Sequence, residues 1–434
     1  MGFVEGRRFQ EPQKDVSTKR RSVLYLNYSS VLTQGLLRSQ AAHLCEQLAR
    51  EGEFDFTLVT AERCEDLRAR RDELSELRAE LKQAGVRLVV VPKLLPRYLT
   101  VLPQGLRRTT HLVPFALDLF VFFVVAGWLI VRRRVRVIHA RSYVAALVGC
   151  FFRKLIGVRL IFDPRGALPE EMAAVRGWAD DDWRLRWWKK RERKILRQAT
   201  AVIVVSTPFR EHFRAIAPEA KYFVIPGCVD LDLFKFDADA RARLRWDMRL
   251  NQRFVAVFSM GSYAPYQNFE QIFPVMREIR KLRGDALLLV LTPDIEAVGG
   301  LLRTNGFRDD DFRIRAAKFN EMPGYLSVAD VALLVRERSV GSRVASPVKF
   351  PEYLACGLSV IATGGVGDTE TALRKWRVGV VVNPDEPVSL AASLTKLLDE
   401  AARDESKIRR AARAAAKDFY CCRKFMSVYR SLYG

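Results

Sequence analysis

The sequence lacks several patterns on which common functions depend. No Gly-x-Gly-x-x-Gly follows the first apolar run, Ser22–Tyr28, which argues against an NAD-dependent oxidoreductase. The four histidines and seven cysteines form no cluster with metal-ligand or redox spacing, so we expect reduced thiols in a reducing cytosol and no metal cofactor. The first thirty residues lack the apolar core of a secretory signal, and residues 1–21 are expected to be a disordered basic tail.

Acidic residues are scarce relative to basic ones. The chain has 72 Lys and Arg against 50 Asp and Glu, a formal net charge of +22. Residues 1–225 hold 40 basic and 24 acidic residues, a net charge of +16, whereas residues 226–434 hold 32 and 26, a net charge of +6. The basic first half predicts a polyanionic partner surface, either nucleic acid or anionic lipid.

A long apolar run favours lipid. Residues His111–Val131 are nearly all apolar, arginines follow at once, and about 20 residues suffice to span a bilayer. Pro114 and Asp118 lie inside the run, both flanks are basic, and the strand-like Val135–Ala140 comes next, as after a crossover helix. We expect a helix partly buried in its own domain and partly in the membrane interface. A fully buried helix and a transmembrane helix are the alternatives.

Short apolar strands alternate with helices in both halves, which predicts an α/β fold with parallel sheets of Rossmann type. The strand pattern breaks near Pro226–Arg245, so we expect one domain over residues 22–225 and another over residues 226–416. Glu65–Ala84 and Val388–Phe419 each read as one continuous helix. The strands expected in the second domain are Phe254–Met260, Ala286–Thr292, Phe312–Arg315, Val331–Val335, Leu358–Thr363 and Val378–Val382.

The stretch SPVKFPEYLACGLSVIAT begins at Ser346 and predicts a helix followed by a strand. Ser346 suits the N-cap, Pro347 suits the first helical position, and Gly357 suits the residue after the helix. We therefore expect a short helix over Pro347–Cys356.

Lys349 and Glu352 are three residues apart and share one face of this helix. Its N-terminal end attracts phosphate, Lys349 adds a cation, and Glu352 could accept hydrogen bonds from sugar hydroxyls. These residues favour a sugar nucleotide as ligand. The alternative is a well-capped surface helix in which the two side chains form an ion pair.

In open α/β sheets, ligands bind at the carboxyl ends of the strands. The residues at or just after the carboxyl ends of expected strands are candidates for the cleft between the domains. They are His139, Arg141, Asp163, Arg165, Gly166, Gly261, Ser262 and the helix after Ser346.

From Ser22 to Gly434 the sequence resembles the retaining glycosyltransferases of family 4 (glycosyltransferase group 1), which have the GT-B fold. The stretch from Ser346 is similar to their donor-site helix, P-x-K-x-x-E-Y-L-A-x-G-x-P-V-I. Val224–Phe234 resembles their interdomain P-N-G-V-D-x-x-x-F, and Tyr325–Val335 resembles their Y-x-x-A-D-v. The resemblance implies two Rossmann-like domains facing each other across a cleft, with a C-terminal helix, about residues 417–434, crossing back to the first domain.

The resemblance also implies roles for particular residues. Glu352 would bind the nucleotide ribose, and Lys349 with the helix start would hold the diphosphate. His139 would lie near the transferred sugar, which makes His139, Lys349 and Glu352 the candidate catalytic residues. The donor-binding candidates are Gly35, Gly261, Ser262, Gln267, Arg336, Ser346, Pro347, Lys349 and Glu352. The acceptor-binding candidates are Arg141, Asp163, Arg165 and Glu170, although Asp163 and Arg165 could simply pair, and Glu170 could be part of an acidic helix start.

This sequence departs from the family in two places. Val344 stands where the family has the first acid of its Glu-x7-Glu pair, which contacts the donor sugar. The family's Arg and Lys after the first strand of the second domain are replaced by Ser262 and Gln267, and Arg336 or Lys349 could supply the missing charge.

The resemblance and the residues predict a retaining hexosyltransferase-like enzyme. It would move a sugar from a nucleoside diphosphate to a hydroxyl of a membrane-associated glycan or lipid-linked acceptor, without a metal ion. The expected location is the cytoplasm, peripherally on the inner face of the membrane, with an anionic lipid surface and not nucleic acid as partner. The alternatives are a catalytically degenerate GT-B protein and a basic nucleic-acid-binding protein.

Overall fold

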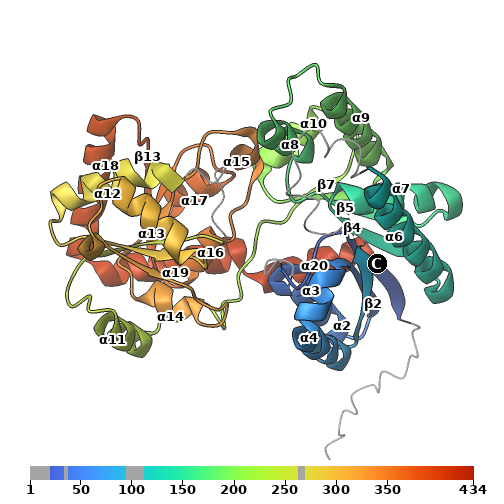
Figure 1. Cartoon of the computed structure of the whole chain (residues 1–434), viewed down its shortest axis with the longest axis horizontal. Helices are drawn as coiled ribbons and strands as arrows, with labels where there is room; N and C mark the ends of the chain where they lie inside the picture. The colour runs from blue at the N-terminus through green and yellow to red at the C-terminus, as the bar shows by residue number, and fades with distance from the viewer. Residues whose placement is uncertain (1–19, 34–37, 94–111, 262–268) are drawn as a thin grey trace, which may run out of the picture.

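The computed structural model describes residues 20–33, 38–93, 112–261 and 269–434, and these fold into two α/β units (Figure 1). Each unit is built on one parallel sheet with helices packed against it. The predicted fold class, two Rossmann-like domains, is therefore confirmed. The expected tail falls almost entirely within residues 1–19, which lie outside the described ranges.

The first unit has a seven-stranded sheet in the order β3-β2-β1-β4-β5-β6-β7. The strands are β1 Arg21–Asn27, β2 Phe54–Arg63, β3 Val86–Lys93, β4 Val137–Arg141, β5 Arg159–Asp163, β6 Ala201–Val204 and β7 Tyr222–Val224. The helices are the π-helix η1 Arg38–Ala42, α2 His43–Arg50, α3 Cys64–Ala69, α4 Arg71–Gln83, α6 Leu112–Arg133, α7 Tyr143–Ile156, α8 Leu168–Arg176, α9 Trp183–Gln198 and α10 Thr207–Arg214.

The second unit has a six-stranded sheet in the order β10-β9-β8-β11-β12-β13. Its strands are β8 Val255–Ser259, β9 Leu287–Leu291, β10 Phe312–Arg315, β11 Val331–Leu334, β12 Ser359–Thr363 and β13 Gly379–Val382. Its helices are α11 Ala238–Asp247, the short η4 Phe269–Gln271, α12 Ile272–Leu282, α13 Ile295–Thr304, the short η5 Asp309–Asp311, α14 Met322–Ser327, α15 Val340–Val344, α16 Lys349–Ala355, α17 Thr369–Trp376, α18 Pro387–Arg403 and α19 Glu405–Tyr420.

In both sheets the winding reverses between two adjacent strands. The reversal lies between β1 and β4 in the first unit and between β8 and β11 in the second. Ligands of doubly wound folds bind beyond the carboxyl ends of the strands at such a point. Asn27 pairs with Arg141 at that end of the first sheet, and Arg141 in turn pairs with Asp163 on β5. The fold thus brings predicted site residues to the reversal point.

The last helix, α20 Cys422–Tyr433, returns to the first unit, and Figure 1 shows it beside the N-terminal elements. Met426, Tyr429, Leu432 and Tyr433 belong to the same buried cluster as residues of β1 and β2. The Tyr433 ring lies 5.7 Å from that of Phe54, so the end of the chain is part of the first core. The crossing back of the C-terminal helix is confirmed.

Two predicted helices are interrupted. The expected single helix over Val388–Phe419 is two helices, because the backbone at Asp404 is non-helical (φ −158°, ψ 80°). The Asp404 carboxylate accepts a hydrogen bond from the Lys407 N–H at 2.9 Å and so caps α19. The segment Glu65–Ala84 is likewise divided at Arg70 into α3 and α4. Local capping outweighed helix propensity at Asp404.

The long apolar run forms α6, which connects β3 to β4 and packs one face on the first core. Phe122, Ala126, Leu129 and Ile130 are buried there, and Asp118 is also buried. The expected burial of one face of this helix is therefore confirmed. Among the described residues, α6 and all other helices fall short of the length and apolarity that a membrane crossing needs.

A tight turn after β12 lies where the two units touch. Gly367 has φ +46°, and a Cβ there would approach the Ala345 carbonyl oxygen to 1.9 Å. The next residue, Asp368, accepts a hydrogen bond from the Thr207 N–H of the first unit at 2.8 Å. Only glycine fits this position without displacing backbone.

We predict that Gly367→Ala lowers the free energy of unfolding by at least about 2 kcal/mol, because the new methyl group collides with backbone. The matched control is Gly300→Ala, within α13, where a Cβ meets no atom within 4 Å. That change should raise stability by about 1 kcal/mol. Urea denaturation of both variants measures the difference. Equal midpoints would contradict the close approach at Gly367.

Candidate functional site

The α16 helix carries the predicted donor residues Lys349 and Glu352. The Lys349 Nζ atom lies 3.0 Å from Glu352 Oε2, and Glu352 is buried. Burial raises the pKa of Glu352, and Lys349 opposes that rise. The hydroxyl of the neighbouring Tyr353 accepts a hydrogen bond from the Ser259 N–H at 2.8 Å, which fixes α16 to the end of β8. The pair is thus held at the carboxyl end of the second sheet.

The helix begins later than predicted. It starts at Lys349, so Ser346 is not its N-cap and Pro347 lies before it. Ser346 Oγ instead accepts a hydrogen bond from the Gly227 N–H at 2.9 Å, in the segment that joins the two units. Because α16 has only seven residues, the Lys349 ammonium is the stronger attraction for a phosphate, ahead of the helix dipole.

The other predicted donor residues follow neighbouring strands. Gly261 follows β8, and Arg336 follows β11. The Thr363 hydroxyl accepts a hydrogen bond from the Arg336 N–H at 2.9 Å and donates one to the Arg336 carbonyl oxygen at 2.8 Å. The charge of Arg336 lowers the pKa of Glu171, on α8 of the first unit, against the larger raising effect of burial. Gly35, Ser262 and Gln267 lie outside the described residues.

Val344, which replaces the family's first acid, is buried in the core of the first unit. Its carbonyl oxygen accepts a hydrogen bond from Ser206 Oγ at 2.8 Å. The position therefore serves contact between the two units, which gives a physical reason for an apolar side chain there.

The structure places His139 inside the first unit. Its ring is completely buried, with Nδ1 2.7 Å from the Tyr433 hydroxyl and Nε2 3.3 Å from Asp163 Oδ2. The Tyr25 ring stacks on it at 4.2 Å. Burial lowers the pKa of His139 although Asp163 opposes the change. Both ring nitrogens are engaged, so contact with a sugar, which stays a prediction, would require α20 to move.

Three of the four predicted acceptor residues meet around one carboxylate. Asp163 Oδ2 lies 2.9 Å from Arg165 Nε and 3.8 Å from Arg141 Nη1. Burial alone would raise the pKa of Asp163, but Arg165, His139 and Arg141 lower it to about 2. The pairing that the sequence left as an alternative is present, and the cluster carries a net positive charge.

The fourth acceptor candidate, Glu170, lies in a second cluster of ionisable side chains, which was not predicted from the sequence. Its Oε1 atom is 3.6 Å from Lys189 Nζ and 3.7 Å from His212 Nε2. Nearby Glu192 is buried and accepts a hydrogen bond from the Tyr143 hydroxyl. The position of Glu192 in the sequence could have indicated its burial, because it shares the inward face of α9 with apolar residues.

Burial raises the pKa of Glu192 to about 7. The folded protein therefore holds a proton that the unfolded chain releases between pH 4.5 and about 7, and stability falls as pH rises through this window. We predict that Glu192→Gln removes this pH dependence. The free energy of unfolding of the variant, relative to that of the wild type, should therefore rise by up to ~3 kcal/mol from pH 4.5 to pH 7.5. Denaturation at several pH values measures it. A constant difference would show that the pKa of Glu192 is not raised in the folded protein.

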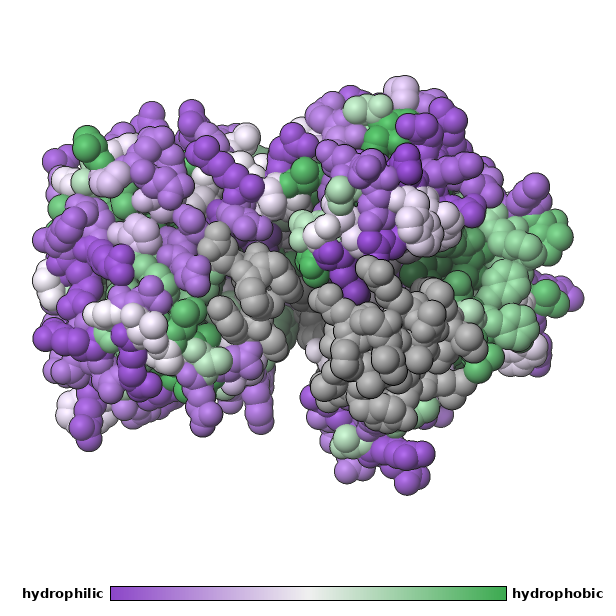
Figure 2. Space-filling model, turned by 45° about the horizontal axis from the view of Figure 1, so that its top comes forward, coloured by the Kyte–Doolittle hydropathy of each residue, from purple (hydrophilic) through white to green (hydrophobic). Residues whose placement is uncertain are grey.

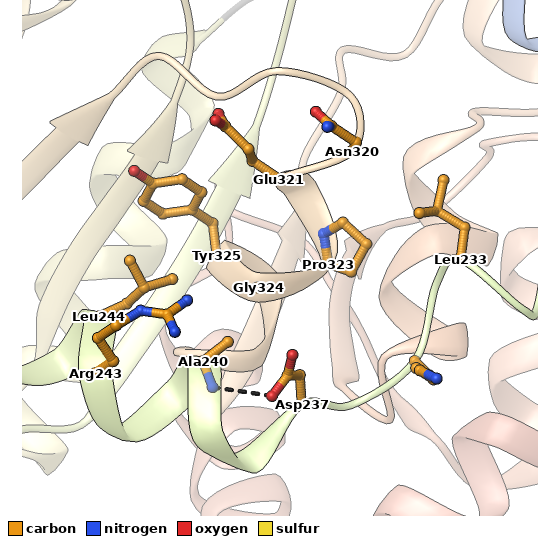
Figure 3. Close-up of a pocket in the computed structure, with 11 residues that line it drawn as sticks. Leu233, Asp237, Ala240, Arg243, Leu244, Asn320, Glu321, Pro323, Gly324 and Tyr325 are labelled. Carbon is orange, nitrogen blue, oxygen red and sulfur yellow. Dashed lines mark hydrogen bonds between the residues drawn. The ribbon is translucent and has the colours of Figure 1, made fainter.

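A cavity of about 420 Å³ lies on the second unit between α11 and the start of α14 (Figure 3). Leu233, Arg243, Glu321 and Tyr325 are among its lining residues, and Asp237 caps α11 by accepting from the Ala240 N–H at 2.9 Å. As far as the described residues go, the predicted site residues do not line it. Across the same ranges, no group of three or more His, Cys, Asp or Glu could hold a metal ion.

Comparison with known proteins identifies both units. Residues 37–228 match the family model of the glycosyl transferase 4-like domain, and residues 254–400 match that of glycosyl transferases group 1. A GDP-mannose-dependent alpha-(1-6)-phosphatidylinositol monomannoside mannosyltransferase of Mycolicibacterium smegmatis is 29% identical over 216 residues, 49% of this chain and 56% of that protein. Its Mycobacterium tuberculosis counterpart is 29% identical over 215 residues, 48% of this chain and 55% of that protein. The match spans about half the length of these relatives.

Solved structures share the fold. Sucrose-phosphate synthase of Thermosynechococcus elongatus superimposes with a TM-score of 0.70 at 16% identity, covering 95% of this chain and 99% of that one. HepE of Anabaena, solved with UDP and glucose, gives a TM-score of 0.64 at 13% identity, covering 94% and 98%. Since the two family models cover most of both units and the two-sheet architecture agrees, the chain belongs to the glycosyltransferase group 1 family and has the GT-B fold.

Proposed function

We propose that this protein is a retaining glycosyltransferase that uses a nucleoside-diphosphate sugar and a hydroxyl acceptor at a membrane surface. The observation that carries the proposal is the Lys349–Glu352 ion pair on α16, at the end of the second sheet, in which Glu352 is buried and Lys349 is partly exposed. A cation for the diphosphate and a carboxyl group for the ribose are thereby held within one helical turn. The mycobacterial relatives are named as GDP-mannose-dependent, which makes GDP-mannose the first donor to test.

The proposed reaction breaks the bond between the anomeric carbon and the diphosphate. The acceptor oxygen bonds to the same face of that carbon, and its proton passes to the departing diphosphate. Positive charge develops on the sugar and negative charge on the phosphate, and Lys349 is positioned to stabilise the latter. Arg336, at the end of β11, supports the same charge. Metal independence stays part of the proposal.

Donor binding tests the site directly. We predict that one sugar nucleotide from a panel of GDP-, UDP- and ADP-sugars raises the melting temperature, because ligands that bind only the folded state stabilise it. The shift should disappear in the double variant Lys349→Ala, Glu352→Ala. The matched control is Lys281→Ala, which breaks an exposed Lys281–Glu278 pair of the same spacing, with its atoms 2.8 Å apart.

A shift that survives in the double variant would place the donor elsewhere. No shift with any sugar nucleotide, in protein shown to be folded, would overturn the transferase proposal in favour of a degenerate GT-B protein or a nucleic-acid-binding one.

The proposed membrane contact is the set of large apolar side chains that α6 and α7 expose, here called the α6–α7 apolar face. Figure 2 shows hydrophobic side chains gathered on one side of the first unit. Asp118, on the same helix as part of this face, α6, is buried and does not belong to it. The exposed members are Leu117, Phe120, Val124, Trp128 and Val131 on α6, and Phe151, Leu155 and Ile156 on α7.

The exposed α6 residues recur every three or four positions, so they form one stripe. The two helices touch through Phe123, whose ring lies 4.8 Å from that of Phe151. Arg132 and Arg133 lie in the last turn of α6, and Arg153 and Lys154 lie in the last turn of α7. An apolar stripe flanked by cations fits the interface of an anionic bilayer, with the cations at the level of the headgroups.

We predict that the double variant Phe120→Ser, Trp128→Ser weakens binding to vesicles of phosphatidylcholine and phosphatidylglycerol at least tenfold, since each buried aromatic side chain contributes about 1.5–3 kcal/mol. Both residues are 62% exposed. The control is Trp246→Ser, on α11 of the second unit, where Trp246 is 81% exposed. Vesicle flotation measures binding. If the wild-type protein does not bind vesicles but does bind RNA, the nucleic-acid alternative would be supported.

A further inference from the structure

The chain passes between the two units twice, and the two passages lie side by side. The first follows β7 and includes residues 226–229, and the second includes residues 420–422, between α19 and α20. Val229 forms a parallel bridge with Cys421. Its N–H donates to the Tyr420 carbonyl oxygen at 2.8 Å, and its own carbonyl oxygen accepts from the Cys422 N–H at 3.4 Å. Any rotation of one unit against the other must therefore pass through this paired segment.

Each passage carries a thiol at this point. Cys228 and Cys422 are both free, and each thiol shifts the pKa of the other. Both line a small cavity of about 30 Å³, together with Arg165 and Tyr429. A disulfide requires Cα atoms within about 7 Å of each other, and two thiols that line one small cavity from neighbouring, paired backbones are candidates for it.

We propose that Cys228 and Cys422 are a reversible oxidation site, at which a disulfide joins the two interdomain passages. The oxidant is a low-molecular-weight disulfide such as glutathione disulfide. The Cys228 thiolate attacks one of its sulfurs and releases one glutathione thiol. The Cys422 sulfur then attacks Cys228 in the mixed disulfide and releases the second. Two protein thiols and one disulfide are thus converted into one protein disulfide and two thiols.

The surroundings favour Cys228 as the attacking group. The Cys422 side chain lowers the pKa of the Cys228 thiol, burial opposes this, and Arg165 adds to the lowering. The Cys228 side chain and burial raise the pKa of Cys422. A thiol whose pKa is lowered beside a cation is the more nucleophilic at neutral pH.

The chemical test does not depend on any transferase activity. Full-length protein is incubated with glutathione disulfide, and its thiols are then counted under denaturing conditions. We expect two of the seven thiols to be lost, and a non-reducing peptide map to show Cys228 joined to Cys422. Dithiothreitol should restore both thiols.

Three single variants identify the partners. Cys228→Ser and Cys422→Ser should each abolish formation of the intramolecular disulfide. Cys421→Ser, the matched control, removes the adjacent thiol and should leave it unchanged. Retention of all the thiols in the wild type, or a peptide map that joins Cys421 to either partner, would overturn the proposal. The map is made on the wild type, so it remains decisive even if a variant folds poorly.

The consequence for catalysis rests on the proposed function. A covalent link between both passages restricts rotation of the two units, so sugar transfer by the oxidised wild type should slow several-fold and recover with reductant. Oxidised Cys422→Ser should keep the rate of its reduced form. Equal rates for oxidised and reduced wild type would show that the disulfide leaves domain motion unaffected. Absence of any transfer would count against the proposed function and not against the thiol site.

Discussion

A buried carboxylate organises the first unit. Asp163 is fully buried at the end of β5, and a charge in that position is tolerated only when it is paired and hydrogen-bonded. Arg165, Arg141 and His139 all lie against its Oδ2 atom, and His139 in turn bonds Tyr433 at the end of the chain. One ionised group thus ties together two strands of the first sheet, the loop after β5 and the helix that returns from the second unit. Removing a partner would leave buried charge uncompensated, at a cost of about 3–5 kcal/mol.

The second unit also buries a carboxyl group, and there, among the described residues, a single cation is its charged partner. Glu352 is buried on a short helix, and Lys349, one turn earlier, is its charged partner. Tyr353 anchors the same helix to β8. The pair therefore needs no rearrangement of α16 to present a cation beside a carboxyl group. Val344 and Ser346 flank this region and hold the two units together, through contacts with Ser206 and Gly227.

The excess positive charge and the apolar surface belong to the same unit. The α6–α7 apolar face and the arginines at its helix ends lie on the unit that holds most of the net charge. The Asp163 cluster belongs to that unit too. A protein that met an anionic bilayer through this face would approach its acceptor with the first unit and leave the second free to carry the donor. The paired passages at Val229 and Cys421 are the place about which the two would turn.

Much of the fold and part of the candidate site follow from local sequence. Apolar strands that alternate with helices determined two parallel sheets, and the spacing of Lys349 and Glu352 determined that they share a helix face. These are short-range effects of period and turn chemistry. The break at Asp404 escaped prediction because a side-chain cap competes with helix propensity on nearly equal terms.

What depends on long-range packing was decided only by the tertiary structure. The resemblance placed His139 near a sugar, and only the structure shows that Tyr433, 294 residues away, is bonded to its ring. Ser346 was assigned to a helix N-cap, yet its hydroxyl accepts a hydrogen bond from the Gly227 N–H in the first interdomain passage. Glu192, Val344 and the Cys228–Cys422 pair likewise acquire their environments from distant segments. Sequence determined the elements and the chemistry available at their ends, because these arise from neighbouring residues. The structure decided which groups are buried or paired, because burial depends on segments that meet only when the chain is folded.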